Sequence, residues 1–174
     1  MNDICKWLPK RILLPNGDFS KYKEYEDELY NIFLSNIYGK IGNYKGKTVN
    51  MRKTPETFNR YESFYHIICD KQGKDIWYPN LERASRILWG KAIIEHNPCE
   101  ENGCECSGLL SWDKIEGNRH MHKILFKDKK YLVILEERKN YWLYITSYYI
   151  EDSYRLRKIS KEYYDTKAKN ALHQ

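Results

Sequence analysis

The 174-residue chain contains no apolar run near the roughly 20 residues that a membrane-spanning helix requires. Its first residues, MNDICKWLPKR, lack the apolar stretch of a secretory signal. Hydrophobic residues make up 41% and charged residues 31%, which excludes a disordered composition. We therefore expect a protein of the cytoplasm with no membrane partner, and the sequence does not set its oligomeric state.

Several catalytic motifs are also missing. The chain has no glycine-rich phosphate loop, no G-x-S-x-G elbow, no H-E-x-x-H helix and no kinase signature. Its acidic residues are scattered, whereas two-metal nuclease chemistry needs a carboxylate cluster. The sequence thus predicts no catalytic metal and no organic cofactor.

Cysteines are few, and their odd number, five, suits a reducing compartment better than a disulfide framework. Three of them, Cys99, Cys104 and Cys106, follow His96 within a turn-rich stretch. Thiols and an imidazole are zinc ligands, but C-x4-C-x-C is not a standard finger spacing. The two interpretations are a structural zinc ion and ordinary reduced thiols.

Positive charge and tyrosine are abundant. The formal net charge is +6 and the chain has 16 tyrosines. A basic chain favours a polyanionic partner, and tyrosines can stack on bases, although most tyrosines serve as core and sheet residues.

Hydrophobic periodicity predicts the secondary structure. We expect helices at 20–38, capped by Ser20, and at 80–96, capped by Asn80, with a short basic helical segment at 153–165 and a frayed tail after it. We expect strands at 43–50, 61–69, 109–112, 122–126, 131–136 and 141–150. These elements predict an α+β fold, a mainly antiparallel curved sheet of four to six strands faced by two or three helices. Residues 1–39 would form a lead-in and a helix packed on a domain at 40–174, in one compact unit.

The strand at 141–150 ends in hydroxyl-bearing side chains. Alternation places Thr146 and Tyr148 on one face with Tyr144, and Ser147 on the opposite, core face. Ordinary β-propensity explains the same residues without any function.

Cations and one imidazole accompany this strand. His66, in the expected strand 61–69, can exchange protons near neutral pH, although it could equally be a structural histidine. Arg83 and Arg86 are neighbours on the helix 80–96, and guanidinium groups bind phosphate, but the helix face could also be a solvated one. Nucleic-acid contacts are predicted for Lys91, Tyr144, Arg155, Arg157 and Lys158.

The order of segments resembles small, phage-associated bacterial proteins of the barnase–EndoU–colicin–RelE nuclease class. The resembling segments are NYKGKTVN, FYHII, NLERASRILWGKAIIE, KYLVILEERKNYWLYITSYYIED and RLRKISKEYY, within residues 40 to 164. The chain departs from the family pattern at two positions. It has Asn80 where the family's helix has an acidic residue, and Ser147 where the family's last strand has alanine. The cysteine stretch has no counterpart.

The resemblance implies a metal-independent ribonuclease, a toxin or phage-defence component, that acts through a 2′,3′-cyclic phosphate. Carried over by position, the catalytic residues would be His66, Arg83, Arg86, Thr146 and Tyr148, with RNA as substrate and an antitoxin or inhibitor protein as partner. Two alternatives stay open: a nucleic-acid-binding module without catalysis, and a phage-encoded protein that binds another protein.

Overall fold

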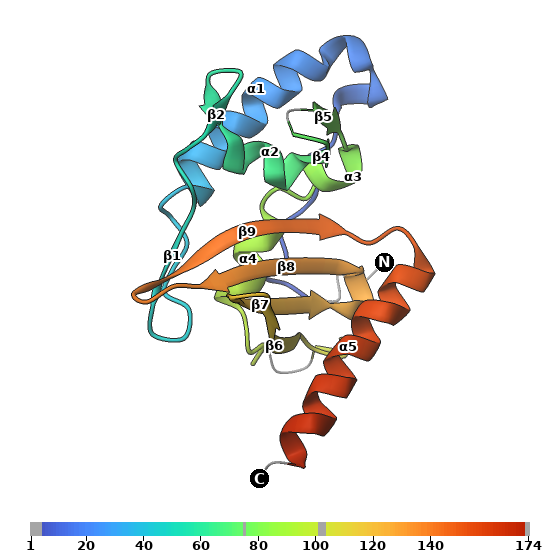
Figure 1. The fold of residues 1–174 in the computed structure, drawn as a ribbon. Helices are drawn as coiled ribbons and strands as arrows, with labels where there is room; N and C mark the ends of the chain where they lie inside the picture. The colour runs from blue at the N-terminus through green and yellow to red at the C-terminus, as the bar shows by residue number, and fades with distance from the viewer. Residues whose placement is uncertain (1–4, 75, 101–103, 173–174) are drawn as a thin grey trace.

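The computed structural model describes residues 5–74, 76–100 and 104–172 (Figure 1). The helices are α1 (Tyr22–Ile32), α2 (Glu62–Ile68), α3 (Leu81–Ala84), α4 (Trp89–Glu95) and α5 (Ser153–Ala171). The strands are β1 (Thr48–Asn50), β2 (Glu56–Thr57), β3 (Arg60–Tyr61), β4 (Cys69–Gln72), β5 (Ile76–Pro79), β6 (Leu110–Glu116), β7 (Arg119–Phe126), β8 (Tyr131–Glu137) and β9 (Tyr141–Tyr149).

A five-stranded sheet organises the chain, with the strand order β1-β9-β8-β7-β6. All of its pairings are antiparallel except β1 with β9, which is parallel. Two short hairpins, β2–β3 and β4–β5, lie outside this sheet. The prediction of an α+β fold with a mainly antiparallel sheet is confirmed.

The sheet buries both of its faces. One face, with Val133 and Tyr144, belongs to the main core, which also contains residues of α1, α2 and α4. The other face carries a smaller cluster in which Trp112, Leu125 and Leu132 meet apolar residues of α5. Figure 1 shows α5 crossing the sheet, with α1, α2 and the β4–β5 hairpin beyond the β9 edge.

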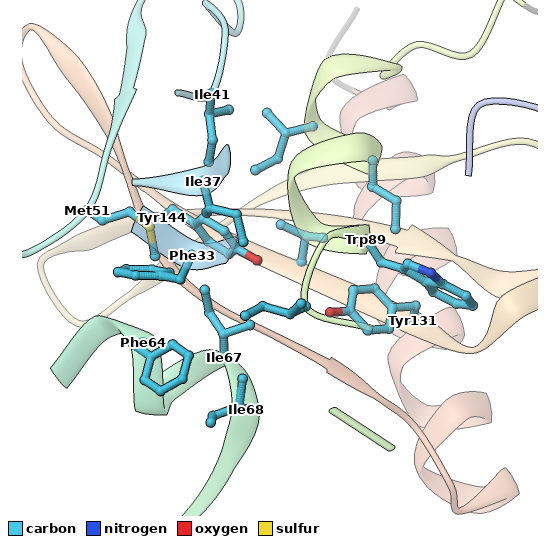
Figure 2. Packing of buried hydrophobic residues seen from close by; sticks show 14 of the residues in the cluster. Phe33, Ile37, Ile41, Met51, Phe64, Ile67, Ile68, Trp89, Tyr131 and Tyr144 are labelled. Atoms are coloured by element: carbon cyan, nitrogen blue, oxygen red, sulfur yellow. The ribbon is translucent and has the colours of Figure 1, made fainter. Parts of the chain in front are cut away.

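The predicted helix at 20–38 forms as α1 followed by a π-helical turn at Phe33–Ile37. Its buried residues recur every four positions (Tyr25, Leu29, Phe33 and Ile37), so one stripe faces the core. Phe33 and Ile37 pack beside Phe64, Ile67 and Tyr144 (Figure 2). The expected Ser20 cap is wrong, because Asp18 accepts the backbone N–H of Ser20 instead.

The predicted strand at 61–69 is wrong for most of its length, because residues 62–68 form helix α2. Its aromatic and branched residues have high β-propensity, but tertiary packing overrides that preference. Phe64, Tyr65, Ile67 and Ile68 are all buried. These residues form two adjacent pairs, 64–65 and 67–68, and the pairs are three residues apart. Burial at that spacing fits a helix, whereas a strand would bury alternate residues.

The helix predicted at 80–96 is divided in two. Asn80 caps α3 by accepting the backbone N–H of Arg83, as expected. Tighter i→i+3 bonds, such as Arg86 N–H to the Arg83 carbonyl, then separate α3 from α4. Helix α5 is longer than predicted and takes in most of the expected tail, whose last two residues lie outside the described part. Across the described ranges no helix combines the length and apolarity needed to span a bilayer.

A β-bulge interrupts β9. Ile134 of β8 pairs with Thr146 and Leu135 pairs with Tyr144, so Ile145 has no partner. The extra residue reverses the alternation, and Tyr144 and Ser147 therefore share the core face, where their hydroxyl oxygens are 2.6 Å apart. Placing Tyr144 with Thr146 and Tyr148 was wrong for this reason.

Candidate functional site

The edge of β9 creates the candidate site. Strand β1 pairs only with residues 141–143, so among the described residues no strand lies beside the rest of β9 on that side. Helices α2 and α3 pack there instead. Beside them is a pocket of about 520 Å³, whose walls include five of the predicted functional residues: His66, Arg83, Thr146, Tyr148 and Arg155. Residues from four distant segments therefore meet in one place.

Arg83 is the structural hub of this pocket. Its Nε donates to the Ile67 carbonyl at 3.2 Å, and its Nη1 pairs with Asp70 at 3.1 Å. Its Nη2 donates to the carbonyls of His66 and Ser147 and to the Thr146 hydroxyl. The side chain is only 12% exposed. Arg83 thus ties α2 and β4 to β9 and has little capacity left for a ligand.

Thr146 completes the connection between β9 and α2. Its hydroxyl accepts the Arg83 hydrogen bond at 2.9 Å and donates to the main-chain carbonyl of His66 at 2.6 Å. The second of these bonds holds the backbone that carries the imidazole, and Arg83 donates to the same carbonyl. Thr146 is therefore placed to orient His66.

The His66 side chain is 39% exposed and faces the pocket from the end of α2. Its Nε2 is 3.6 Å from Glu62, and its ring meets Trp77 edge-on with 4.9 Å between centroids. Burial lowers the pKa of His66 below its usual value, although the nearby Glu62 carboxylate opposes the shift. The shift favours the neutral imidazole, the form that accepts a proton.

Tyr148 lies between two guanidinium groups. The Arg155 guanidinium carbon is 4.8 Å from the ring centroid and that of Arg83 is 5.5 Å away. Arg155 also donates to the Tyr148 hydroxyl at 3.2 Å. Arg155 begins α5, whose cap Asp152 accepts its backbone N–H. This contact keeps an exposed arginine at the rim of the pocket.

The charges on the pocket wall are balanced rather than strongly positive. Lys71, Arg83 and Arg155 face three acids: Asp70, Glu151 and Asp152. Asp70 is paired with Arg83, and Asp152 is occupied in capping α5. Lys71 is paired with Glu62 at 2.5 Å, so Arg155 is the cation on the described wall that has no acidic partner.

A second hollow, of about 430 Å³, adjoins the same histidine. His66 and Lys71 line both pockets, and the second is also lined by Arg52, Glu62 and Arg119. The imidazole therefore stands between two recesses, and the second has more cationic than acidic residues on its described walls.

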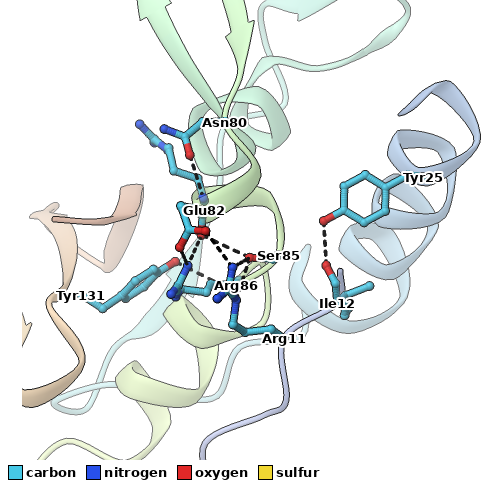
Figure 3. A network of polar contacts seen from close by, with 9 residues as sticks. Arg11, Ile12, Tyr25, Asn80, Glu82, Ser85, Arg86 and Tyr131 are labelled. Carbon is cyan, nitrogen blue, oxygen red and sulfur yellow. Dashed lines mark hydrogen bonds and ion pairs between the residues drawn. The ribbon is translucent and has the colours of Figure 1, made fainter. Parts of the chain in front are cut away.

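Arg86 does not join this site. It is 7% exposed, its Nη1 pairs with Glu82 at 2.5 Å, and its guanidinium stacks on Tyr149 at 4.2 Å. Figure 3 shows Arg86 in a polar network with Glu82, Ser85 and Arg11 on the lead-in segment. The tighter turn after α3 directs Arg86 away from Arg83.

The predicted nucleic-acid contacts are divided. Arg155 lines the pocket, whereas Arg157 and Lys158 are exposed farther along α5. Lys91 donates to the Asn36 carbonyl at 3.0 Å and takes no part in either pocket's wall. Tyr144 is buried in the core, so its ring is closed to base stacking.

Lys71 and Trp77 are among the pocket residues that sequence reasoning missed. Lys71 and Trp77 face each other as a cross-strand pair in the β4–β5 hairpin, and the lysine nitrogen lies 4.6 Å from the indole ring. The segment DKQGKD indicates a turn and therefore a hairpin. Nothing in the sequence indicates that this hairpin lies beside His66.

The cysteines gather differently from the prediction. Sulfur atoms of Cys5, Cys104 and Cys106 lie within 4.8 Å of one another and could hold a metal ion. His96 and Cys99 are outside this group: His96 binds the Ala92 carbonyl through Nδ1 and stacks on Trp7. Cys5 is far away in sequence, and no spacing motif indicates it.

Comparisons with protein-family models, with curated proteins and with solved structures each found no match for this chain.

Proposed function

We propose that the chain is a metal-independent endoribonuclease that cleaves RNA through a 2′,3′-cyclic phosphate. The observation that carries the proposal is the convergence of a partly exposed histidine, a tyrosine and an exposed arginine on one pocket. Such groups supply proton transfer and charge stabilisation without a metal ion.

In this mechanism the neutral His66 takes the proton from the ribose 2′-hydroxyl. The 2′-oxygen bonds to phosphorus, and the bond from phosphorus to the 5′-oxygen breaks. Lys71 and Tyr148 are the donors on the pocket wall that can protonate the leaving oxygen. The products are a 2′,3′-cyclic phosphate and a 5′-hydroxyl.

The remaining residues have supporting roles. Arg155 would neutralise the phosphate oxygens, because Arg83 is committed to backbone carbonyls and Lys71 is paired with Glu62. Arg83 and Thr146 would hold the α2 backbone so that the imidazole meets the phosphate. This revises the roles that the resemblance implies, in which Arg83 and Thr146 contact substrate and Arg86 is catalytic.

The two recesses beside His66 give an RNA chain room on both sides of the cut phosphate. Arg52 in the second recess would contact the neighbouring phosphate, because Arg119 is bound through two nitrogens to Glu136. An inhibitor protein could cover the same opening, and the enzyme would act in the cytoplasm. Any structural zinc ion would sit at the cysteine cluster, away from the reaction.

One observation favours a second function, nucleic-acid binding without catalysis. Arg83 donates its hydrogen bonds to backbone carbonyls of the protein, and the cationic and acidic residues on the pocket wall are equal in number. Such a surface would bind RNA through Arg155, Lys71 and aromatic rings and leave the chain uncut.

Incubation of the purified protein with total RNA in EDTA separates the two functions. The ribonuclease predicts fragments with cyclic-phosphate ends, detected by end-group mass spectrometry. Retention of RNA with no new ends would leave only the binding function. A protein that neither cleaves nor retains RNA would have neither function.

A further inference from the structure

Three thiols from two distant parts of the chain meet at one point. Cys5 belongs to the lead-in, whereas Cys104 and Cys106 lie just before β6. The Cys104 sulfur is 3.3 Å from that of Cys5 and 3.1 Å from that of Cys106. No local turn forces Cys5 into this contact, since 99 residues separate it from Cys104.

The sulfur positions are close to those that one metal ion needs. A zinc–sulfur distance of about 2.3 Å in tetrahedral geometry places two ligand sulfurs about 3.8 Å apart. The separations of 3.3 and 3.1 Å are somewhat shorter than that value, and all three sulfurs lie within 4.8 Å of one another. An outward shift of roughly half an ångström would admit an ion, whereas a disulfide, at about 2.05 Å, would require an approach of more than one ångström.

A metal ion at this point would connect two segments that are each anchored to the rest of the fold. Cys5 is buried, and the lead-in after it bonds to α4, where Trp89 Nε1 donates to the Pro9 carbonyl at 2.9 Å. On the other side, Ser107 is bound to Asp128 through its backbone N–H and its hydroxyl. Both partners of the cluster are therefore anchored close by, and a metal ion would join them.

We infer that Cys5, Cys104 and Cys106 form a structural zinc site that fastens the lead-in to the segment before β6. The site differs from the grouping that sequence spacing suggests, because Cys5 takes the place of Cys99 and His96. Zinc favours thiolate sulfur as a ligand, and a water molecule would occupy the fourth coordination position. Binding would release the thiol protons to solvent as the sulfurs coordinate the ion, with no change of oxidation state.

The test uses the reduced, full-length protein, first freed of metal with a chelator and then titrated with Co²⁺ and Zn²⁺. We expect about one Co²⁺ per chain, with a thiolate-to-cobalt charge-transfer band that Zn²⁺ removes. Cys5→Ser and Cys106→Ser should each weaken binding by more than about 100-fold. Cys69→Ser is the matched control, because Cys69 is also buried and lies outside the cluster, and it should bind normally.

Circular dichroism of each variant separates loss of the site from loss of the fold. Zinc should raise the melting temperature of the wild type and of Cys69→Ser, and should leave that of Cys5→Ser and Cys106→Ser unchanged. Absence of a cobalt band in the folded wild type would overturn the inference. So would equal binding by Cys106→Ser, or intact-mass detection of a Cys5–Cys104 disulfide in protein whose reduced form takes up no cobalt. None of these outcomes bears on RNA cleavage, since the cluster lies outside both pocket walls.

Discussion

Thr146 donates a hydrogen bond from its hydroxyl to the main-chain carbonyl of His66, with 2.6 Å between the two oxygens. The bond joins β9 to α2 across 80 residues of sequence. It couples the hydroxyl-rich strand to the only histidine in the pocket wall as described.

Replacing Thr146 tests this coupling. Thr146→Val keeps the shape but removes the hydroxyl that bridges Arg83 and the His66 carbonyl, so that carbonyl keeps only its bond from Arg83. We expect the free energy of unfolding in urea to fall by about 1–3 kcal/mol. Thr146→Ser retains the hydroxyl and should lose less. A valine variant as stable as the wild type would show that the bond does not hold α2.

Gly90 permits α4 to approach β9 closely. A Cβ added there would collide with the Tyr144 hydroxyl and come within 2.9 Å of the Ser147 hydroxyl oxygen. Gly90→Ala should therefore destabilise the protein by about 1–3 kcal/mol, although alanine favours helix. The penalty should shrink in a Tyr144→Phe background, measured as a double-mutant cycle. An unchanged penalty would place the strain elsewhere.

The success of the strand predictions and the failure at α2 have one physical explanation. Local patterns predict β7, β8 and β9 because neighbouring hairpin strands need only alternation and tight turns. Residues 62–68 have high β-propensity, so their local pattern favours a strand, and only packing against other elements makes them helical.

The candidate site was predictable in part for the same reason. Residue chemistry indicated His66, Arg83, Thr146, Tyr148 and Arg155, and the structure brings these together. The position of Arg86 depends on a tighter turn, that of Tyr144 on a bulge, and that of Cys5 on a contact 99 residues away. None of these three features has a signal in local spacing.

Glu162 fastens α5 to the sheet and should make stability depend on pH. It accepts hydrogen bonds from Lys114, Lys123 and Trp112. Burial opposes ionisation, but these bonds prevail and lower the pKa of Glu162 to about 2. Because the folded-state pKa lies below the ordinary value of 4.5, the stabilisation is present above pH 4.5 and is lost as the pH falls toward 2.

Glu162→Gln should accordingly be less stable than the wild type near neutral pH, with the difference narrowing in acid. Thermal melts across this range measure it, and the exposed Glu24→Gln is the control. A stability difference that does not change with pH would contradict the assignment.

Arg155 and Arg157 form a matched pair for RNA binding. Both are exposed on α5, but only Arg155 lines the pocket. Arg155→Ala should weaken binding to single-stranded RNA and reduce the slope of log affinity against log salt by about 0.7, the value for one phosphate contact. Arg157→Ala should have a smaller effect. Equal effects would indicate general attraction to α5 and not a site at its start.

The measurement that tests ribonuclease activity most directly compares His66→Ala with His120→Ala in EDTA. Both histidines are 39% exposed, but His120 lies on β7 outside either pocket wall. The proposed mechanism predicts that His66→Ala lowers the rate of cyclic-phosphate formation by about 10²- to 10⁴-fold, while His120→Ala cleaves at the wild-type rate. Equal cleavage by the two variants would contradict it.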